Sequence, residues 1–463
     1  MYTATPRVAV VMLVLSASPG VLSQSATGRI LHVGGAGEYR SVQDAVADAR
    51  DGDAIQVAQG VYSDNVRLTL SKSITIQGGW DADFTTRSND RSLTVIDGGG
   101  RDSVFYISAG SGINISVILE GFTLRNGNAD RGGGIRAEAV GSGAHLQLTL
   151  SQNSISDNAS TSYGGGVQVY ASSPQGTATA VLSANGNYIQ DNTSTDTGGG
   201  LALWSLDDAL LTATLTGNQV AANKASTFAA GIWINAGHQG SKTEVTMIRN
   251  VISGNAGPNL DGGGLAAYAS GSGAYTVVSL SGNTIAANSS GYGGGGFFYA
   301  WGAGAVMNAV LTDNLIADNR GEMTFGGLAL TATDAAAGAF QLTGNTFSGN
   351  WSGDGVSNGL SVLSGNNQLP PGTDASTVAV QSHNDILWGN IGTPDSLDLA
   401  IYADSASDPA LVTASYSAFG TVNNHLGTFT ADHCTIGSSS STSSAGASMP
   451  PALASSRGHR GAP

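Results

Sequence analysis

Five aromatic residues follow glycine clusters at intervals of about 30 residues, a spacing at which their rings could line one face of the protein. Sugar rings stack on flat aromatic faces, so a row of this kind predicts a glycan-binding stripe. The alternative is that long connections after these residues, such as residues 172–180, fold back and bury the rings. The five candidates are Tyr170, Trp204, Trp233, Tyr268 and Phe298.

Charged residues offer fewer candidates for catalysis. Two carboxylates can act as acid and base in glycoside hydrolysis, and Asp207 and Asp208 are adjacent, but we interpret them as a solvated loop beyond a strand. A lyase that abstracts a proton next to a carboxylate needs a cationic base. Lys224 and Arg320 occupy equivalent places three repeats apart. If repeats stack at the spacing of β-strands, these two residues lie about 14 Å apart, which is too far for one proton-transfer site.

Metal ligands are also few. Asp130, Asp196 and Asp261 each precede a glycine cluster, and a row of carboxylates there could bind Ca²⁺. Because serine or threonine takes this place in other repeats, we interpret it as a polar turn position. The seven histidines show no zinc-binding spacing. The sequence therefore predicts no cofactor, with Ca²⁺ as the one metal to consider.

All these residues lie in a repeat of about 32 residues. Each copy holds an Asn-x-apolar-x-x-Asn segment, then a glycine cluster and an apolar strand, as in NSISDN from Asn153 and GGGVQVY from Gly164. The first asparagines of successive copies are 34, 31, 32, 33, 31 and 31 residues apart, which predicts a stacked array. The copies begin at Asn153, Asn187, Asn218, Asn250, Asn283, Asn314 and Asn345.

The repeat predicts an all-β fold, because its short alternating runs leave no room for a helix. The first and third residues after the glycines are apolar and should face inward, with the second and fourth facing outward. In the copy with four glycines this counting places Phe297 and Tyr299 inward and Phe298 outward. Strands that pair with their equivalents in the next copy, three per turn, form a right-handed parallel β-helix. Asparagine amides could bond from coil to coil, and glycine permits tight bends.

The ends of the chain differ from the array. Residues 41–50 form an amphipathic pattern that predicts a helix capping the first coil, with Ser41 as its N-cap. Residues 1–23 predict a secretory signal peptide and hence export. The β-helix should span residues 29–435, and the Ser/Gly/Pro-rich residues 437–463 predict a disordered tail. Cys434 is the single cysteine, so no intrachain disulfide can form.

Charge limits the partners that we expect. The formal net charge is −15, and residues 137–456 hold 4 Lys or Arg against 20 Asp or Glu. An array this acidic is a poor binder of nucleic acid. No segment after residue 23 is apolar enough to cross a membrane. We expect a monomer whose partner is a polysaccharide or a cell-surface glycan, and the scarcity of basic residues weighs against a lyase of anionic polymers.

Several segments resemble the pectin lyase-like superfamily of right-handed parallel β-helix repeat proteins. Residues 30–68, which begin ILHVGGAGEYRSVQDAV, look like its first coil and cap, and residues 74–87 (ITIQGGWDADFTTR) are similar to exported bacterial members of unassigned activity. NDILWGN from Asn384 resembles the last coils of surface members. The resemblance implies the fold. Of the polygalacturonase motifs, counterparts exist only as Asp207–Asp208 and the GHQG segment at His238, and the pectin methylesterase set has no counterpart.

Together these features predict an exported β-helix protein of the cell surface or medium, a glycan-binding or adhesion-type scaffold with no recognisable catalytic set. The alternative is a polysaccharide-active enzyme, either a pectate lyase-like lyase or a glycoside hydrolase. A third interpretation is a purely structural stalk.

Overall fold

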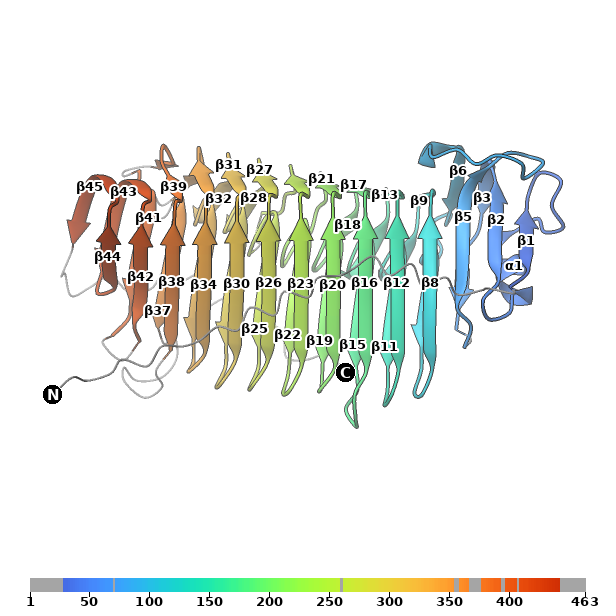
Figure 1. Cartoon of the computed structure of the whole chain (residues 1–463), viewed down its shortest axis with the longest axis horizontal. Coiled ribbons are helices and arrows are strands. Elements are labelled where there is room, and N and C mark those ends of the chain that lie inside the picture. The colour runs from blue at the N-terminus through green and yellow to red at the C-terminus, as the bar shows by residue number, and fades with distance from the viewer. Residues whose placement is uncertain are drawn as a thin grey trace.

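The protein is an all-β parallel β-solenoid of about 11 turns, with about 32 residues per turn, as the sequence predicted. Its computed structural model describes residues 28–69, 71–258, 261–353, 358–365, 376–392, 396–405 and 408–441. The predicted signal peptide and residues 442–463 of the predicted tail lie outside these ranges. Figure 1 shows the coils stacked along one axis. The right hand of the coil stays a prediction.

One side of every coil is a long strand, and these strands form a single 14-stranded sheet. Its strands pair in parallel, mostly over seven residues, with one residue of each coil opposite its equivalent in the next. The strands are β1 (Ile30–Val33), β2 (Ala54–Ala58), β5 (Ile74–Trp80), β8 (Asn114–Glu120), β12 (His145–Ser151), β16 (Thr179–Asn185), β20 (Leu210–Thr216), β23 (Lys242–Ile248), β26 (Tyr275–Ser281), β30 (Val306–Thr312), β34 (Ala337–Thr343), β38 (Thr377–His383), β42 (Ala410–Ser415) and β44 (Thr428–Asp432).

From β2 onward a short strand follows each long strand, and in the repeats from Asn153 to Asn350 it lies inside the Asn-x-apolar-x-x-Asn segment. Its central apolar residue, for example Ile189 or Val220, is buried in the core. The short strands are β3 (Gly60–Ser63), β6 (Thr94–Asp97), β9 (Thr123–Arg125), β13 (Ser154–Ser156), β17 (Tyr188–Gln190), β21 (Gln219–Ala221), β24 (Val251–Ser253), β27 (Thr284–Ala286), β31 (Leu315–Ala317), β35 (Thr346–Ser348) and β39 (Ile386–Leu387), with β43 (Ala418–His425) and β45 (Thr435–Ser441) ending the ladder.

Two further strands complete a coil, one before and one after the glycines. We call those before the glycines the cover strands: β10 (Asn128–Arg131), β14 (Ala159–Tyr163), β18 (Thr193–Ser194), β28 (Ser289–Tyr292), β32 (Arg320–Thr324), β36 (Trp351–Ser352) and β40 (Ile391–Gly392). We call those after the glycines the floor strands: β4 (Val66–Leu68), β7 (Phe105–Ala109), β11 (Ile135–Val140), β15 (Val167–Ser172), β19 (Leu201–Leu206), β22 (Ile232–Gly237), β25 (Leu265–Ser270), β29 (Gly296–Trp301), β33 (Leu328–Thr333), β37 (Leu360–Gly365) and β41 (Leu399–Ala403).

The first coil carries the one α-helix among the described residues. Helix α1 (Val42–Asp48) begins after Ser41, whose Oγ accepts the backbone N–H of Asp44 (3.0 Å). Its apolar face joins the main core beside β1 and β2 (Figure 1), where a cap was expected. The 3₁₀ helix η1 (Arg91–Leu93) precedes β6. At the other end β45 runs to Ser441, so residues 437–441 of the predicted tail belong to the solenoid.

Two columns of asparagines tie each coil to the next, one at each end of the short strands. Asn187 Nδ2 donates to Asn218 Oδ1 (2.9 Å) and to the Leu150 carbonyl (2.9 Å). Asn187 Oδ1 in turn accepts the backbone N–H (2.9 Å) and the Nδ2 group (3.1 Å) of Asn153. Both donors and both lone pairs are thereby satisfied, so the amide can be fully buried without an unpaired polar atom. The second column contains Asn158, Asn192, Asn223, Asn255, Asn288, Asn319, Asn350 and Asn390.

Both columns end on an aspartate. Asp385 Oδ1 accepts the backbone N–H (2.7 Å) and Nδ2 (2.9 Å) of Asn345, and Asp398 Oδ1 accepts the same two groups of Asn390 (3.0 and 2.7 Å). An ionised carboxylate only accepts, so it ends a column in which every amide donates toward the next coil. The aligned amide dipoles point their positive ends at these aspartates. Burial nevertheless raises the pKa of Asp385.

The third glycine of each cluster is required by this asparagine stack. A Cβ atom at Gly264 would lie 2.7 Å from the Gly295 carbonyl oxygen and 2.8 Å from Asn288 Nδ2, and the equivalent atom at Gly200 is as crowded. The first glycine position has a positive φ, and a Cβ atom at Gly262 would clash with the Leu265 carbonyl oxygen. This position nevertheless adapts to a side chain, because Ala229 (φ 41°) and Phe325 (φ 60°) occupy it in two coils. Close packing of backbone on backbone therefore dictates the third position.

We predict that Gly264→Ala lowers the free energy of unfolding by about 3 kcal/mol, because the new methyl group must displace a carbonyl or a column amide. Gly110→Ala is the matched control: no atom lies within 4 Å of its Cβ position and its φ is not positive, so stability should be unchanged or rise by less than about 1 kcal/mol. Urea unfolding followed by circular dichroism measures both. Equal midpoints for the two variants would contradict this account.

Candidate functional site: the outer corner

The predicted aromatic stripe lies mostly in a second hydrophobic cluster outside the main core. The cluster fills the angle between the cover strands and the outward face of the floor strands, which we call the outer corner. Trp233 on β22 and Tyr268 on β25 are each only 7% exposed, so no sugar can stack on them while the corner is closed. Tyr170 on β15 and Trp204 on β19 are partly exposed.

Among the five predicted stripe residues, Phe298 is the one whose side chain points into the main core. Gly296, the fourth glycine of its cluster, pairs with Leu265 and takes the first strand position, so Phe298 faces inward and is fully buried in the main core. Phe297 and Tyr299 point into the outer corner instead. The prediction for these three residues was wrong, because Gly296 occupies an inward position where a side chain would clash with Leu328 (2.9 Å).

The cover strands, rather than the connections after the floor strands, bury the rings. One cover position per coil contacts the floor: Tyr163 lies 4.6 Å from Trp204 and 5.5 Å from Trp233, and Phe228 lies 5.5 Å from Tyr268, between ring centroids. A sequence signal for this was present, because Tyr163, Phe228 and Tyr292 each directly precede the glycine or alanine cluster of their copy.

A carboxyl group is buried among these rings. Asp261 occupies the cover position between Phe228 and Tyr292, and its Oδ2 accepts a hydrogen bond from the Tyr268 hydroxyl (3.0 Å). Burial raises the pKa of Asp261 to about 7, although the bond from Tyr268 opposes the shift. Burial also raises the pKa of Tyr268 well above its usual value. The sequence predicted this aspartate as a polar turn residue and not as part of an aromatic cluster.

The corner opens toward the N-terminal coils. Tyr170 and Trp204 lie side by side with ring centroids 4.9 Å apart, and burial raises the pKa of Tyr170. On the preceding coil, opposite Tyr170, Glu138 is held by Arg136 (2.6 Å) and by the Tyr106 hydroxyl (3.2 Å). The open end thus presents two adjoining rings beside a neutralised ion pair.

Several polar atoms of the corner have no hydrogen-bond partner among the described residues. They are both amide atoms of Gln168, which is fully buried on β15, and the Nε1 atoms of Trp204 and Trp233. Leaving a buried donor or acceptor unpaired costs about 1–3 kcal/mol. Because these atoms are buried, a hydroxyl group reaches them only when the corner opens.

The charged residues considered for catalysis do not form one cluster: Asp207 lies beside His238, whereas Lys224 and Arg320 lie in another column. Asp207 and Asp208 both have positive φ in a turn, where Asp207 contacts His238 Nδ1 (3.0 Å). Lys224 and Arg320 share a cover column three coils apart, as predicted, and Arg320 is paired with Glu322 (2.6 Å).

The aspartates considered for Ca²⁺ are also separated. Asp130 and Asp196 belong to one column with Ser162 between them, because Arg131 pairs with Tyr163 and Tyr163 with Thr197. Asp261 belongs to the neighbouring column and faces the rings. Within the described ranges no three His, Cys, Asp or Glu side chains come together as a metal site.

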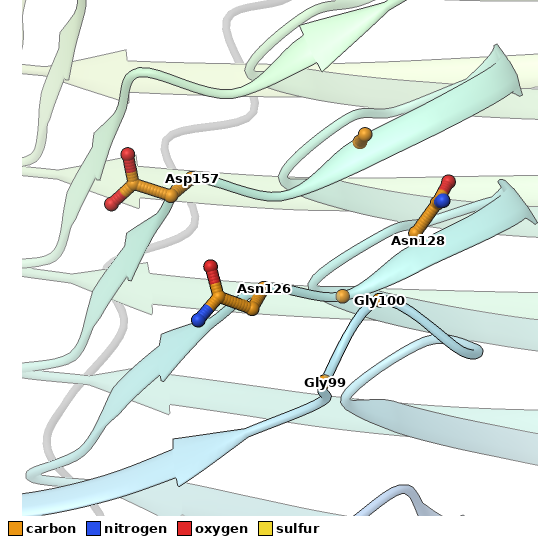
Figure 2. A pocket seen from close by; sticks show the side chains of 7 residues that line it. Gly99, Gly100, Asn126, Asn128 and Asp157 are labelled. Atoms are coloured by element: carbon orange, nitrogen blue, oxygen red, sulfur yellow. The ribbon is translucent and has the colours of Figure 1, made fainter.

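A shallow polar depression lies at the N-terminal cover strands. Figure 2 shows Asn126 and Asp157 projecting from adjoining coils beside the Gly99–Gly100 loop. Asn126 Nδ2 is already bonded to Asp97 (2.8 Å), and no aromatic ring lines the depression. To a sugar it offers backbone groups and three polar side chains, those of Asn126, Asn128 and Asp157.

The fold places this protein in the class of parallel β-solenoids. No family model, no curated protein and no solved structure matches the chain. None of the helices in the described ranges has the length and apolarity to span a membrane.

The inward position of Phe298 generates a prediction. Phe298→Ala should lower the free energy of unfolding by about 3–5 kcal/mol, because it leaves a cavity in the main core. Trp301→Ala is the control on the same strand, since Trp301 is 45% exposed, and its effect should stay below about 1 kcal/mol. The midpoints of urea unfolding measure both effects. A midpoint for Phe298→Ala close to that of Trp301→Ala would contradict the register of β29.

Proposed function

We propose that this protein is an exported scaffold that binds neutral glycans at the open end of the outer corner. The observation that carries the proposal is the pair of partly exposed rings, Tyr170 and Trp204, beside the Arg136–Glu138 ion pair. A sugar ring can stack on such a platform while its hydroxyls bond to the polar groups around it. The predicted signal peptide supports export.

Charge favours a neutral ligand over an anionic one. Arg136 is engaged by Glu138, and Arg131, which lies over the Tyr163 ring (5.7 Å to the centroid), is close to Asp130 (3.4 Å). The remainder of the solenoid is strongly acidic. Polyuronates would meet repulsion and find their cationic partners already paired, whereas a neutral chain would not.

Titration with soluble neutral polysaccharides tests the proposal. The panel contains xyloglucan, galactomannan and mixed-linkage glucan. We expect Trp204→Ala to weaken binding of the tightest-binding member about tenfold or more, and tenfold corresponds to ~1.4 kcal/mol. Trp301→Ala removes an exposed tryptophan on another coil and should leave affinity unchanged. Polygalacturonate serves as the anionic comparator.

The same samples separate binding from catalysis. Analysis of the polysaccharides for new reducing ends or unsaturated products should show none. Product release would favour the enzyme interpretation, and equal loss of affinity in both tryptophan variants would remove the platform from the site.

A further inference from the structure

The cover of the outer corner contains one position whose side chain can change its charge. In successive coils this position holds Tyr163, Thr197, Phe228, Asp261 and Tyr292, paired by single parallel bridges. Four of these side chains are neutral over the whole physiological pH range. Asp261 is the carboxyl among them, and it lies against the rings that the stripe prediction singled out.

The surroundings of Asp261 disfavour its charged form. The group that faces it from the floor is the hydroxyl of Tyr268 on β25, which in turn interacts with Tyr299 on β29. Its bridge partners in the adjoining coils are Phe228 and Tyr292. Within the described ranges no Lys, Arg or His nitrogen lies within 4.0 Å of its carboxylate. An ionised carboxylate here has one hydrogen bond in place of hydration.

Around Asp261 the described residues of the cover form isolated bridges instead of paired strands. Strands β14 and β18 pair on one side, and β28 and β32 on the other. Between them the cover is joined by isolated bridges at Lys224, Phe228, Ala256 and Asp261. Two amide hydrogen bonds flank Asp261: Ala229 N–H donates to the Asp261 carbonyl (3.1 Å) and Gly262 N–H to the Tyr292 carbonyl (2.7 Å).

We propose that ionisation of Asp261 releases the cover at this position and uncovers Tyr268 and Trp233 as an extension of the glycan platform. The role of Tyr268 and Trp233 as a glycan platform rests on the proposed function, whereas the release of the cover does not. Moving the carboxylate into water removes the cost of its burial, and the two flanking amide hydrogen bonds are the local interactions lost in return.

The direction of the pH dependence follows from the raised pKa. Burial places the pKa of Asp261 at about 7 in the closed corner, above the value of roughly 4 for an exposed aspartate. The stabilisation of the closed cover by neutral Asp261 is therefore complete below about pH 4 and is lost as the pH rises through 7. The closed corner should therefore be most stable near pH 4 and least stable at pH 7 and above.

Hydrogen exchange of the full chain between pH 4.5 and 8.5, corrected for intrinsic rates, tests the release. In the wild type, protection of the Ala229 and Gly262 amides should fall about tenfold per pH unit below pH 7 and level off above it, where Asp261 is ionised in both the closed and the open corner. Gly165, bonded to the Gly198 carbonyl (3.1 Å) in a coil remote from Asp261, should keep its protection. Equal loss at Gly165 would mean general unfolding and would overturn the proposal.

Two variants give opposite signatures. Asp261→Asn keeps an acceptor for Tyr268 but cannot ionise, so protection at Ala229 and Gly262 should not depend on pH. Tyr268→Phe removes the hydrogen bond that favours the carboxylate, so the transition should move to higher pH. A wild-type profile in Asp261→Asn, or a downward move in Tyr268→Phe, would overturn the release.

Affinity for the best neutral polysaccharide, measured at pH 6 and pH 8.5, tests the link to the glycan site. We expect tighter binding at the higher pH in the wild type and no change in Asp261→Asn. If exchange follows the predicted pattern but affinity does not, the release stands and its role in glycan binding is overturned. Loss of binding in Trp204→Ala separately reports on the platform itself.

Discussion

The structure depends on the contact between the asparagine columns and the third glycine of each cluster. A column amide reaches its partners only if the backbone of the glycine bend lies directly against it, and a single Cβ atom at Gly264 would come within 2.8 Å of Asn288 Nδ2. The hydrogen bonds of the asparagine column therefore require glycine at this position, because a residue with a Cβ atom would displace the amide. This pairing repeats at the spacing that the backbone ladders set between coils, so the columns and the ladders reinforce one another.

A scaffold held in this way leaves its outward positions free to vary. In the outer corner this freedom has produced a second hydrophobic cluster, built by cover residues such as Tyr163 and Phe228 over floor residues such as Trp204 and Tyr268. The cluster closes over its centre and stays open at Tyr170. The corner therefore combines an accessible ring platform with a buried continuation, and Asp261 lies where the two strands of the corner meet.

The acidic character of the coils and the pairing of the nearby arginines are the electrostatic basis for proposing a neutral ligand at the platform. Arg136 is held by Glu138, which also accepts from Tyr106, so the polar end of the corner carries little net charge. Burial of Asp261 among rings acts in the same direction, because it favours the neutral carboxyl. In the two proposals, electrostatics links what the corner binds to the pH at which its centre opens.

The sequence by itself determined the repeat, the parallel all-β coil, the asparagine columns and the start of α1, because each is dictated by local spacing and by the special chemistry of Asn, Gly and Ser. It did not determine the register of β29, since four consecutive glycines leave open which one begins the strand. Only the tertiary structure showed Gly296 opposite Leu265 and Phe298 in the core. It also decided that Trp233, Tyr268 and Asp261 share one buried corner, because that depends on how a cover strand folds over the floor strands of neighbouring coils, a contact between residues that no period along the chain specifies.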